Sequence, residues 1–227
     1  MRRTIALSAF FSSGFAGLVY QVCWIREASL VFGSTTLAMS TVVAVFFLGL
    51  AVGSYTFARI GQATTRPLRL FVLAELGLAA LALASGFGFH TIDAIYGAAY
   101  RVVGDALVSL TLIRLGLVTL LLFPPTFLMG GTLPLFCRQF VVNEATISGT
   151  VGLLYGVNTL GAAAGCVAAG FWLIPHIGLQ GTIALAVPTK AMEIGSGIRY
   201  PELTSRDQWP VWPLNGPPTI REAQINW

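Results

Sequence analysis

Ionisable and amide side chains inside long apolar stretches are the residues of this chain whose type and position could do chemistry. Glu75 lies near the start of the apolar stretch from Leu70 to Phe89. An acid at that depth is costly unless it is protonated, paired or directed into a polar cavity. Two interpretations stay open: a hydrogen bond or arginine pair that holds helices together, which is favoured, and a binding site for a small cation.

Arg114 and Asn158 complete the candidate intramembrane polar site. Arg114 enters the stretch from Leu107 to Phe123 from the membrane face opposite to that of Glu75. Snorkelling of its guanidinium to the near headgroups is therefore easier than a pair with Glu75. Asn158 lies midway along an apolar stretch, where its amide can bridge two helices or bind a ligand, and the bridge is favoured.

The other reactive side chains suggest no site. Cys23, Cys137 and Cys166 are an odd number without ligand spacing and lie in or beside apolar segments, which is typical of small buried residues. His90 and His176 have no neighbouring cysteine or acid pair. No nucleophile, base and orienting group can be assembled, so we expect no catalytic residue, no metal and no cofactor.

Composition places the chain in a membrane. Of its 227 residues, 56% are hydrophobic and only 10% are charged, and the mean hydropathy is +0.79. The run from Thr35 to Ala58 holds no charge and exceeds the roughly 20 residues that a helix needs to cross about 30 Å of hydrocarbon. We therefore predict an all-α, polytopic transmembrane helix bundle. The net charge of +4 is read as loop charge that sets orientation, so no nucleic-acid partner is expected.

Five spans are predicted, near residues 4–24, 35–58, 70–89, 107–123 and 151–173. The first has the layout of a signal peptide, but its apolar part is too long and no small-x-small cleavage site follows, so a retained helix is favoured. Tyr20, Gln21, Trp24 and Arg26 look like the polar and aromatic rim at the end of that helix.

Two further elements are expected between and after these spans. His90–Gly104 places Ile92 and Tyr96 on one helical face, which indicates a short helix lying in the interface. Pro124 and Pro125 each lack an N–H, so we expect the fourth apolar block to be broken or re-entrant after Phe123.

Glycines four residues apart let helices approach closely, and three such pairs are expected to form packing faces. They are Gly49 with Gly53, Gly152 with Gly156, and Gly161 with Gly165.

Lysine and arginine placement predicts a cytoplasmic N-terminus, in the cell (inner) membrane. Six arginines fall in the segments on that side and two on the other. The first group is Arg2, Arg3, Arg59, Arg66, Arg69 and Arg138, and the second is Arg26 and Arg101.

The C-terminal part changes character. Ile177–Val187 is apolar but short, which suggests a sixth helix that stops before completion. Residues 188–227 are rich in proline and polar residues, so we expect a tail that is extended or ordered only against a partner. Trp209, Trp212 and Trp227 are candidate anchors to the interface or to another subunit.

Four ordered segments carry a family resemblance: Phe10–Ser54, Arg66–Gly77 (RPLRLFVLAELG), Phe123–Arg138 (FPPTFLMGGTLPLFCR) and Val151–Thr182. Together they resemble the N-terminal membrane half of fused MFS-like/spermidine synthase proteins. In that family the helices precede a Rossmann-like aminopropyltransferase domain. Nothing similar follows here, so no enzyme is expected. A natural short form, a gene fragment and a frameshifted end stay open. The patch Met192–Gly197 is read as a Gly-rich loop, because a nucleoside turn needs a strand before it and a helix after it.

Two functions follow. The favoured one is an integral membrane subunit that packs through its glycine faces within a larger membrane complex. The alternative is a transporter-like module in which Glu75, Asn158 and the break at Pro124 and Pro125 line a path for a small cation. The resemblance implies a polyamine as that cation, and the lipid bilayer is a partner in both.

Overall fold

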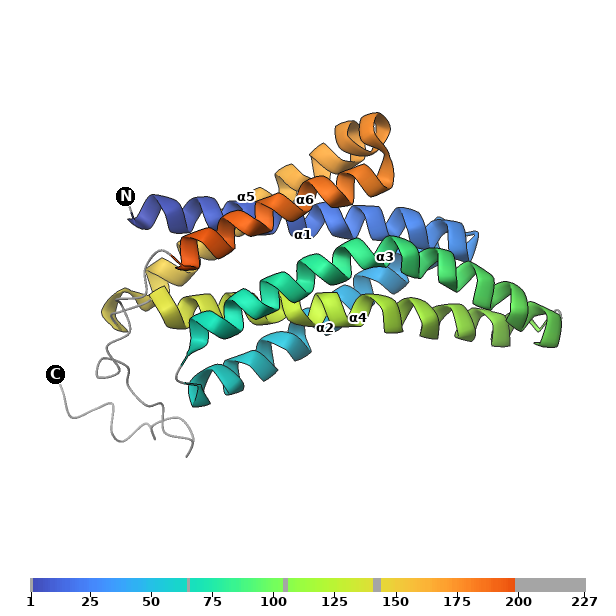
Figure 1. The fold of residues 1–227 in the computed structure, drawn as a ribbon, viewed down its shortest axis with the longest axis horizontal. Coiled ribbons are helices and arrows are strands. Elements are labelled where there is room, and N and C mark those ends of the chain that lie inside the picture. Colours follow the sequence, from blue (N-terminus) through green and yellow to red (C-terminus); the bar gives the residue numbers. More distant parts are fainter. Residues whose placement is uncertain (1, 65, 104–105, 141–143, 199–227) are drawn as a thin grey trace.

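The computed structural model describes residues 2–64, 66–103, 106–140 and 144–198, and all regular structure among them is helical. Six α-helices and one short π-helix follow one another along the chain (Figure 1). They are α1 (Arg2–Phe32), α2 (Thr35–Ala63), α3 (Pro67–Val103), α4 (Leu107–Phe140), α5 (Glu144–Ala168), η1 (Ala169–Leu173) and α6 (Ile174–Ile198).

Successive helices run in alternating directions along the long axis of the bundle (Figure 1). Helix α4 packs along both α2 and α3, while α1 packs along α5, α6 and α2. Helix α6 also contacts α3, which closes the bundle around α1. The end that holds the N-terminus and the α2–α3 connection is called the N-terminal end below. The end that holds the α1–α2 turn is called the far end.

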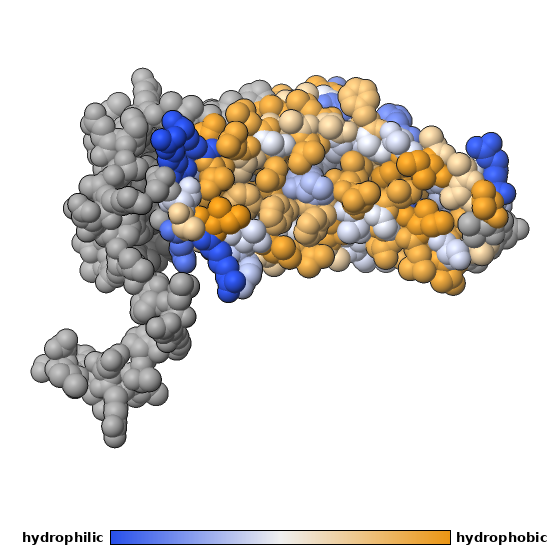
Figure 2. Space-filling view, turned by 60° about the horizontal axis from the view of Figure 1, so that its bottom comes forward, coloured by the Kyte–Doolittle hydropathy of each residue, from blue (hydrophilic) through white to orange (hydrophobic). Residues whose placement is uncertain are grey.

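Five stretches are long and apolar enough to cross a membrane, which confirms the all-α, multi-span prediction. They are Leu7–Phe32, Thr35–Ala63, Arg69–Val102, Val108–Leu135 and Gly152–Val187. Apolar residues cover the flank of the bundle and strongly polar ones lie toward its two ends (Figure 2). This distribution matches a hydrocarbon layer between two aqueous faces, so the chain is a polytopic membrane protein.

Two glycines reverse the chain at the far end. Gly33 joins α1 to α2 with a φ of 65°, and Gly178 has a φ of 71° inside the stretch that continues as α6. Both values lie in the left-handed region, which glycine enters without steric cost. The last apolar stretch therefore folds back on itself at Gly178, and α6 returns toward the N-terminal end (Figure 1).

The sixth helix is complete, contrary to the expectation that it stops near Val187. Helix α6 continues past Pro188 to Ile198. A proline removes one backbone donor and need not end a helix whose neighbouring turns remain bonded. The first part of the expected tail, residues 188–198, is therefore helical, while residues 199–227 lie outside the described part of the chain.

Helix α4 is also continuous, so the predicted break or re-entrant segment at Pro124 and Pro125 is wrong. Both prolines lie inside one 34-residue helix. The hydroxyl of Thr126 donates to the carbonyl oxygens of Leu122 (2.8 Å) and Phe123 (3.0 Å), which adds polar bonds in the turn around the prolines. Prolines are tolerated in membrane helices, where neighbouring helices support the turns that lack a backbone bond.

The separate interfacial helix expected at His90–Gly104 does not exist, because α3 runs without interruption to Val103. Nothing in the sequence between Phe89 and Ile92 ends a helix, and both residues are buried in the same core. The axis of α3 nevertheless changes direction partway along its length (Figure 1).

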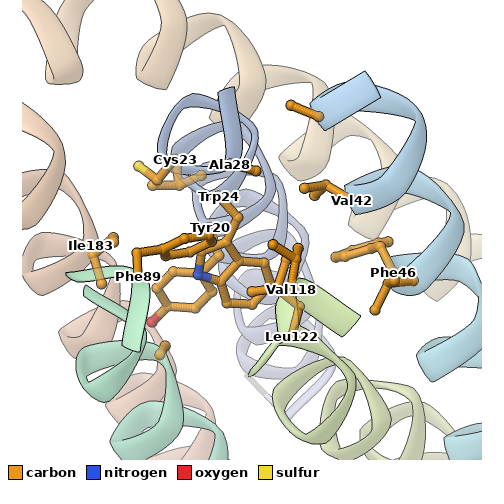
Figure 3. Close-up of a cluster of buried hydrophobic side chains, with 14 of the residues drawn as sticks. Tyr20, Cys23, Trp24, Ala28, Val42, Phe46, Phe89, Val118, Leu122 and Ile183 are labelled. Carbon is orange, nitrogen blue, oxygen red and sulfur yellow. The ribbon is translucent and has the colours of Figure 1, made fainter. Parts of the chain in front are cut away.

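The largest hydrophobic cluster surrounds Tyr20 and Trp24 of α1, whose rings stack with centroids 5.8 Å apart (Figure 3). Both side chains are 0% exposed, and Val118 and Leu122 of α4 pack against the same cluster. The interpretation of Tyr20 and Trp24 as an interfacial rim is therefore wrong. Helix α1 extends beyond Arg26 to Phe32, because Gly33 is the first residue that ends it, and Trp24 consequently lies in the interior.

Candidate functional site

Glu75 is the only acidic or basic side chain that is fully buried in the described part of the chain. It lies on α3 and is 0% exposed. Gly77, two residues after Glu75, lies near Leu128, since a Cβ there would come within 3.0 Å of that side chain, so this part of α3 lies close to α4. A carboxyl group enclosed by helices in an apolar bundle is the arrangement expected of either a structural bridge or a cation site.

Glu75 and Asn158 lie at a similar level in the bundle. The indole of Trp24 on α1 hydrogen-bonds Ser85 on α3, and these two helices run in the same direction (Figure 1). Counting back equally along both helices places Glu75 roughly level with Gly14, since each residue rises about 1.5 Å. A Cβ on Gly14 would overlap the carbonyl oxygen of Asn158 on α5. The amide and the carboxyl therefore occupy one layer of the bundle, on helices that both pack against α1.

Arg114 lies far from this layer, at the far end. Its Nη1 donates to the carbonyl oxygen of Phe32 over 3.1 Å, and its guanidinium carbon lies 3.8 Å from the ring centroid of Tyr96. Tyr96 is nearly six turns of α3 beyond Glu75, or about 30 Å along the helix. The structure therefore divides the three candidate polar residues into two sites. Arg114 serves as a cap at the end of α1, where carbonyl groups attract a cation.

Two of the three glycine pairs lie at helix contacts. A Cβ on Gly49 would overlap Thr126, and a Cβ on Gly53 would overlap the carbonyl oxygen of Phe127, so α2 and α4 meet backbone to backbone there. Gly161 and Gly165 lie in the same way against α1. The carbonyl groups that they touch belong to Phe11 and Phe15.

The third pair lies on an open surface. Gly152 and Gly156 have no atom within 4 Å of a Cβ position, and both are exposed. Large side chains flank them: Tyr155 is 62% exposed and Leu160 is 67% exposed. Helix α5 thus packs one small-residue face on α1 and presents a second one outward. The outward face is called the α5 surface below and comprises Gly152, Tyr155, Gly156, Thr159, Leu160 and Ala163.

The remaining candidates are dispersed or outside the described residues. Cys23 is buried, whereas Cys166 is exposed and on another helix. His176 Nδ1 lies 2.6 Å from the carbonyl oxygen of Trp172 one turn earlier, and His90 is exposed. No three His, Cys, Asp or Glu side chains cluster within the described part of the chain. Cys137, Trp209, Trp212 and Trp227 are not among the residues whose side chains are described.

The Gly-rich patch at Met192–Gly197 lies inside α6, so it is neither the expected loop nor a turn between a strand and a helix. A nucleoside-binding turn of the dinucleotide-fold type requires that strand–turn–helix context.

Sequence reasoning missed two polar contacts that join distant helices. One is the Trp24–Ser85 hydrogen bond of 3.0 Å, and the other joins Gln180 Nε2 to Glu27 Oε1 over 3.4 Å. If the first helix had been predicted to continue as far as Gly33, Trp24 would have been placed in the interior of the bundle. Nothing in the sequence alone indicates which helix would lie opposite Glu27.

Comparison with family models, with curated proteins and with solved structures gives no match for this chain.

Proposed function

We propose that this protein is an integral membrane subunit that docks against another membrane protein through the α5 surface. The observation that supports this proposal is the contrast between the two small-residue faces of α5. Gly161 and Gly165 lie against the backbone of α1, whereas Gly152 and Gly156 meet no other part of the described residues. Small residues favour helix association in lipid because they let backbones approach closely. The α5 surface offers that same approach to a helix from outside.

The test is the native mass of the protein extracted from its own membrane with the surrounding lipid. Wild-type protein is expected in an assembly heavier than the single chain, and Gly156→Leu is expected to release it. Gly116→Leu is the matched control, because Gly116 is also an exposed helical glycine without neighbours but lies on α4. A wild-type protein that travels as a single chain would remove the proposal.

The tail is a second contributor to this assembly. Trp209, Trp212 and Trp227 are aromatic side chains in a polar segment, which suits them to anchor at a partner surface or at the headgroups. Deletion of residues 201–227 is expected to weaken the assembly without unfolding the helix bundle. Retention of full native mass by the truncated protein would remove the tail from the proposal.

A transporter-like module is the second candidate, and buried Glu75 favours it. A carboxyl group at 0% exposure, in the same layer as Asn158, is a plausible counter-charge for a small cation. The resemblance to the membrane half of fused MFS-like/spermidine synthase proteins suggests a polyamine. The continuous α4 counts against a discontinuous-helix site, so the path would have to run between helices.

For both candidate functions, we propose that the N-terminus lies on the cytoplasmic side of the membrane. Arg59, Arg66 and Arg69 are exposed at the N-terminal end, while Arg26 and Arg101 are exposed at the far end. The excess of arginine at the N-terminal end favours the cytoplasmic side, by the general bias of lysine and arginine toward that face.

A further inference from the structure

The far end of the bundle is uneven, because the α3–α4 hairpin extends past the α1–α2 turn. Arg114 fixes the register: it binds the last residue of α1, Phe32, and lies over the ring of Tyr96. Everything after Tyr96 on α3 and before Arg114 on α4 therefore lies beyond the end of α1. At about 1.5 Å a residue, each helix continues for roughly 10 Å. Figure 1 shows the same projection of α3 and α4 beyond α1 and α2.

This projecting part is called the overhang and comprises residues 97–103 and 106–113. Its outer surface is largely apolar. Val102 is 87% exposed, Val108 is 74% exposed and Leu112 is 60% exposed. Tyr100 is 46% exposed, and Arg101 beside it is exposed and bonded through Nε to the carbonyl oxygen of Gly97 at 3.3 Å. Exposed valines and leucine side by side are unfavourable in bulk water and would be stabilised by an apolar or interfacial surface laid over them.

The position of the membrane boundary limits which kind of molecule can contact the exposed apolar side chains of the overhang. Arg26 is exposed, and Glu27 contacts Gln180, all on the far side of the core and before the α1–α2 turn. Polar groups at this level indicate that the hydrocarbon ends no farther out than Phe32. The headgroup layer adds about 5 to 8 Å on each side of the hydrocarbon. An overhang of roughly 10 Å therefore lies at the depth of the headgroups and just beyond them.

We propose that the overhang binds the lipid surface on the side of the membrane opposite the N-terminus. Val102, Val108 and Leu112 lie at the depth of the headgroups, where Tyr100 and Arg101 bind the polar groups of the lipids. The apolar span of α3, Arg69–Val102, has 34 residues and about 51 Å of helix, which is too long for about 30 Å of hydrocarbon at ordinary tilt. Helix α3 changes direction partway along its length, so its final part is inclined to its first part (Figure 1).

Lipid is the occupant that the observations favour over a protein. Tyrosine and arginine next to exposed aliphatic side chains form the combination found where helices meet headgroups. The overhang also continues directly from surfaces of α3 and α4 that the bilayer already covers. Gly97 is the single glycine among the described residues of the overhang, so the overhang has no pair of glycines four residues apart like the pair on the α5 surface.

The test places a fluorescent probe on the overhang in vesicles that contain this protein alone. In a background without native cysteines, Val102→Cys and Val108→Cys are labelled with a polarity-sensitive dye and reconstituted into phosphatidylcholine. Quenching by lipids with a spin label near the headgroup is compared with quenching by iodide in the buffer. Ser34→Cys, in the α1–α2 turn, is the depth reference, and an upright hairpin would place positions 102 and 108 farther into water than position 34.

We expect the dye at positions 102 and 108 to be quenched by the shallow spin label at least as strongly as at position 34, and severalfold less by iodide than free dye. Iodide quenching equal to that of free dye would put the overhang in water and overturn the proposal. Protection from both quenchers would also overturn it, because the surface would then be covered by a second copy of this chain or buried below the headgroups. Both valines are exposed, so labelling them does not disturb the core.

Discussion

The indole Nε1 of Trp24 donates a hydrogen bond to the hydroxyl oxygen of Ser85, 3.0 Å away, in the middle of the bundle. The Ser85 hydroxyl in turn donates to the carbonyl oxygen of Ala82 at 2.6 Å. Both side chains are 0% exposed, and the bond joins α1 to α3 across 61 residues of sequence. It fixes the register of the two helices and with it the layer in which Glu75 lies.

This bond should be measurable as a coupling between two substitutions. Trp24→Phe and Ser85→Ala each remove it, so the double variant should lose less stability than the sum of the single variants. Double-mutant cycles in membrane proteins average about 0.6 kcal/mol for such bonds, and we expect a coupling of that order. Unfolding by sodium dodecyl sulfate in mixed micelles gives the four free energies. Strict additivity would contradict the contact.

The two faces of α5 should respond oppositely to the same small change. In Gly161→Ala the new methyl group overlaps the carbonyl of Phe11, so we expect a loss of about 1 to 3 kcal/mol. In Gly156→Ala the methyl group meets nothing, and the higher helix propensity of alanine stabilises the helix by up to about 1 kcal/mol. The same micelle titration tests both. Equal effects at the two positions would contradict the packing of α5.

Pro124 offers a test of the continuous fourth helix. It is exposed, and alanine there restores an N–H directed at the carbonyl of Leu120. We expect Pro124→Ala to keep the helical circular dichroism and to leave thermal stability unchanged or raised. A re-entrant turn would depend on the proline, so a lower melting temperature together with a changed helix content would contradict the uninterrupted α4.

Glu75 separates the two candidate functions. Glutamine keeps the size and hydrogen-bonding capacity of the side chain and removes the charge, whereas leucine removes both. We expect Glu75→Leu to be less stable than Glu75→Gln by about 1 to 3 kcal/mol, because glutamine can keep polar interactions of the buried side chain that leucine cannot make. Uptake of labelled spermidine into vesicles measures the other role. Equal uptake by wild type and Glu75→Gln would remove the transport candidate while leaving the structural role intact.

The sequence predicted the helical class and five apolar stretches because hydropathy over some twenty residues follows directly from the energetics of the bilayer. It mislocated ends. Arg26 and Pro124 were read as boundaries, but a charge near a helix end can snorkel, and a proline can remain within a membrane helix that neighbouring helices support.

Interactions between helices were not predictable in the same way. The glycine pairs at positions 49, 152 and 161 have identical spacing, yet only the first and third lie at contacts. The spacing of two glycines shows that they share one face of a helix. Which neighbouring helix packs on that face depends on the whole bundle. Two properties place Glu75 and Arg114 in separate layers: the direction of each helix and the register between helices. The order of the spans predicts the direction of each helix, but it does not predict the register.

Immersion in lipid is the claim on which everything above depends, and extraction of isolated membranes tests it most directly. Membranes containing the full-length protein are washed with alkaline carbonate and then with a mild detergent, and the protein is followed by immunoblot in the pellet and supernatant. The bundle predicts that the protein stays in the pellet through carbonate and moves to the supernatant only with detergent. Recovery of intact protein in the carbonate supernatant would contradict a membrane-spanning bundle.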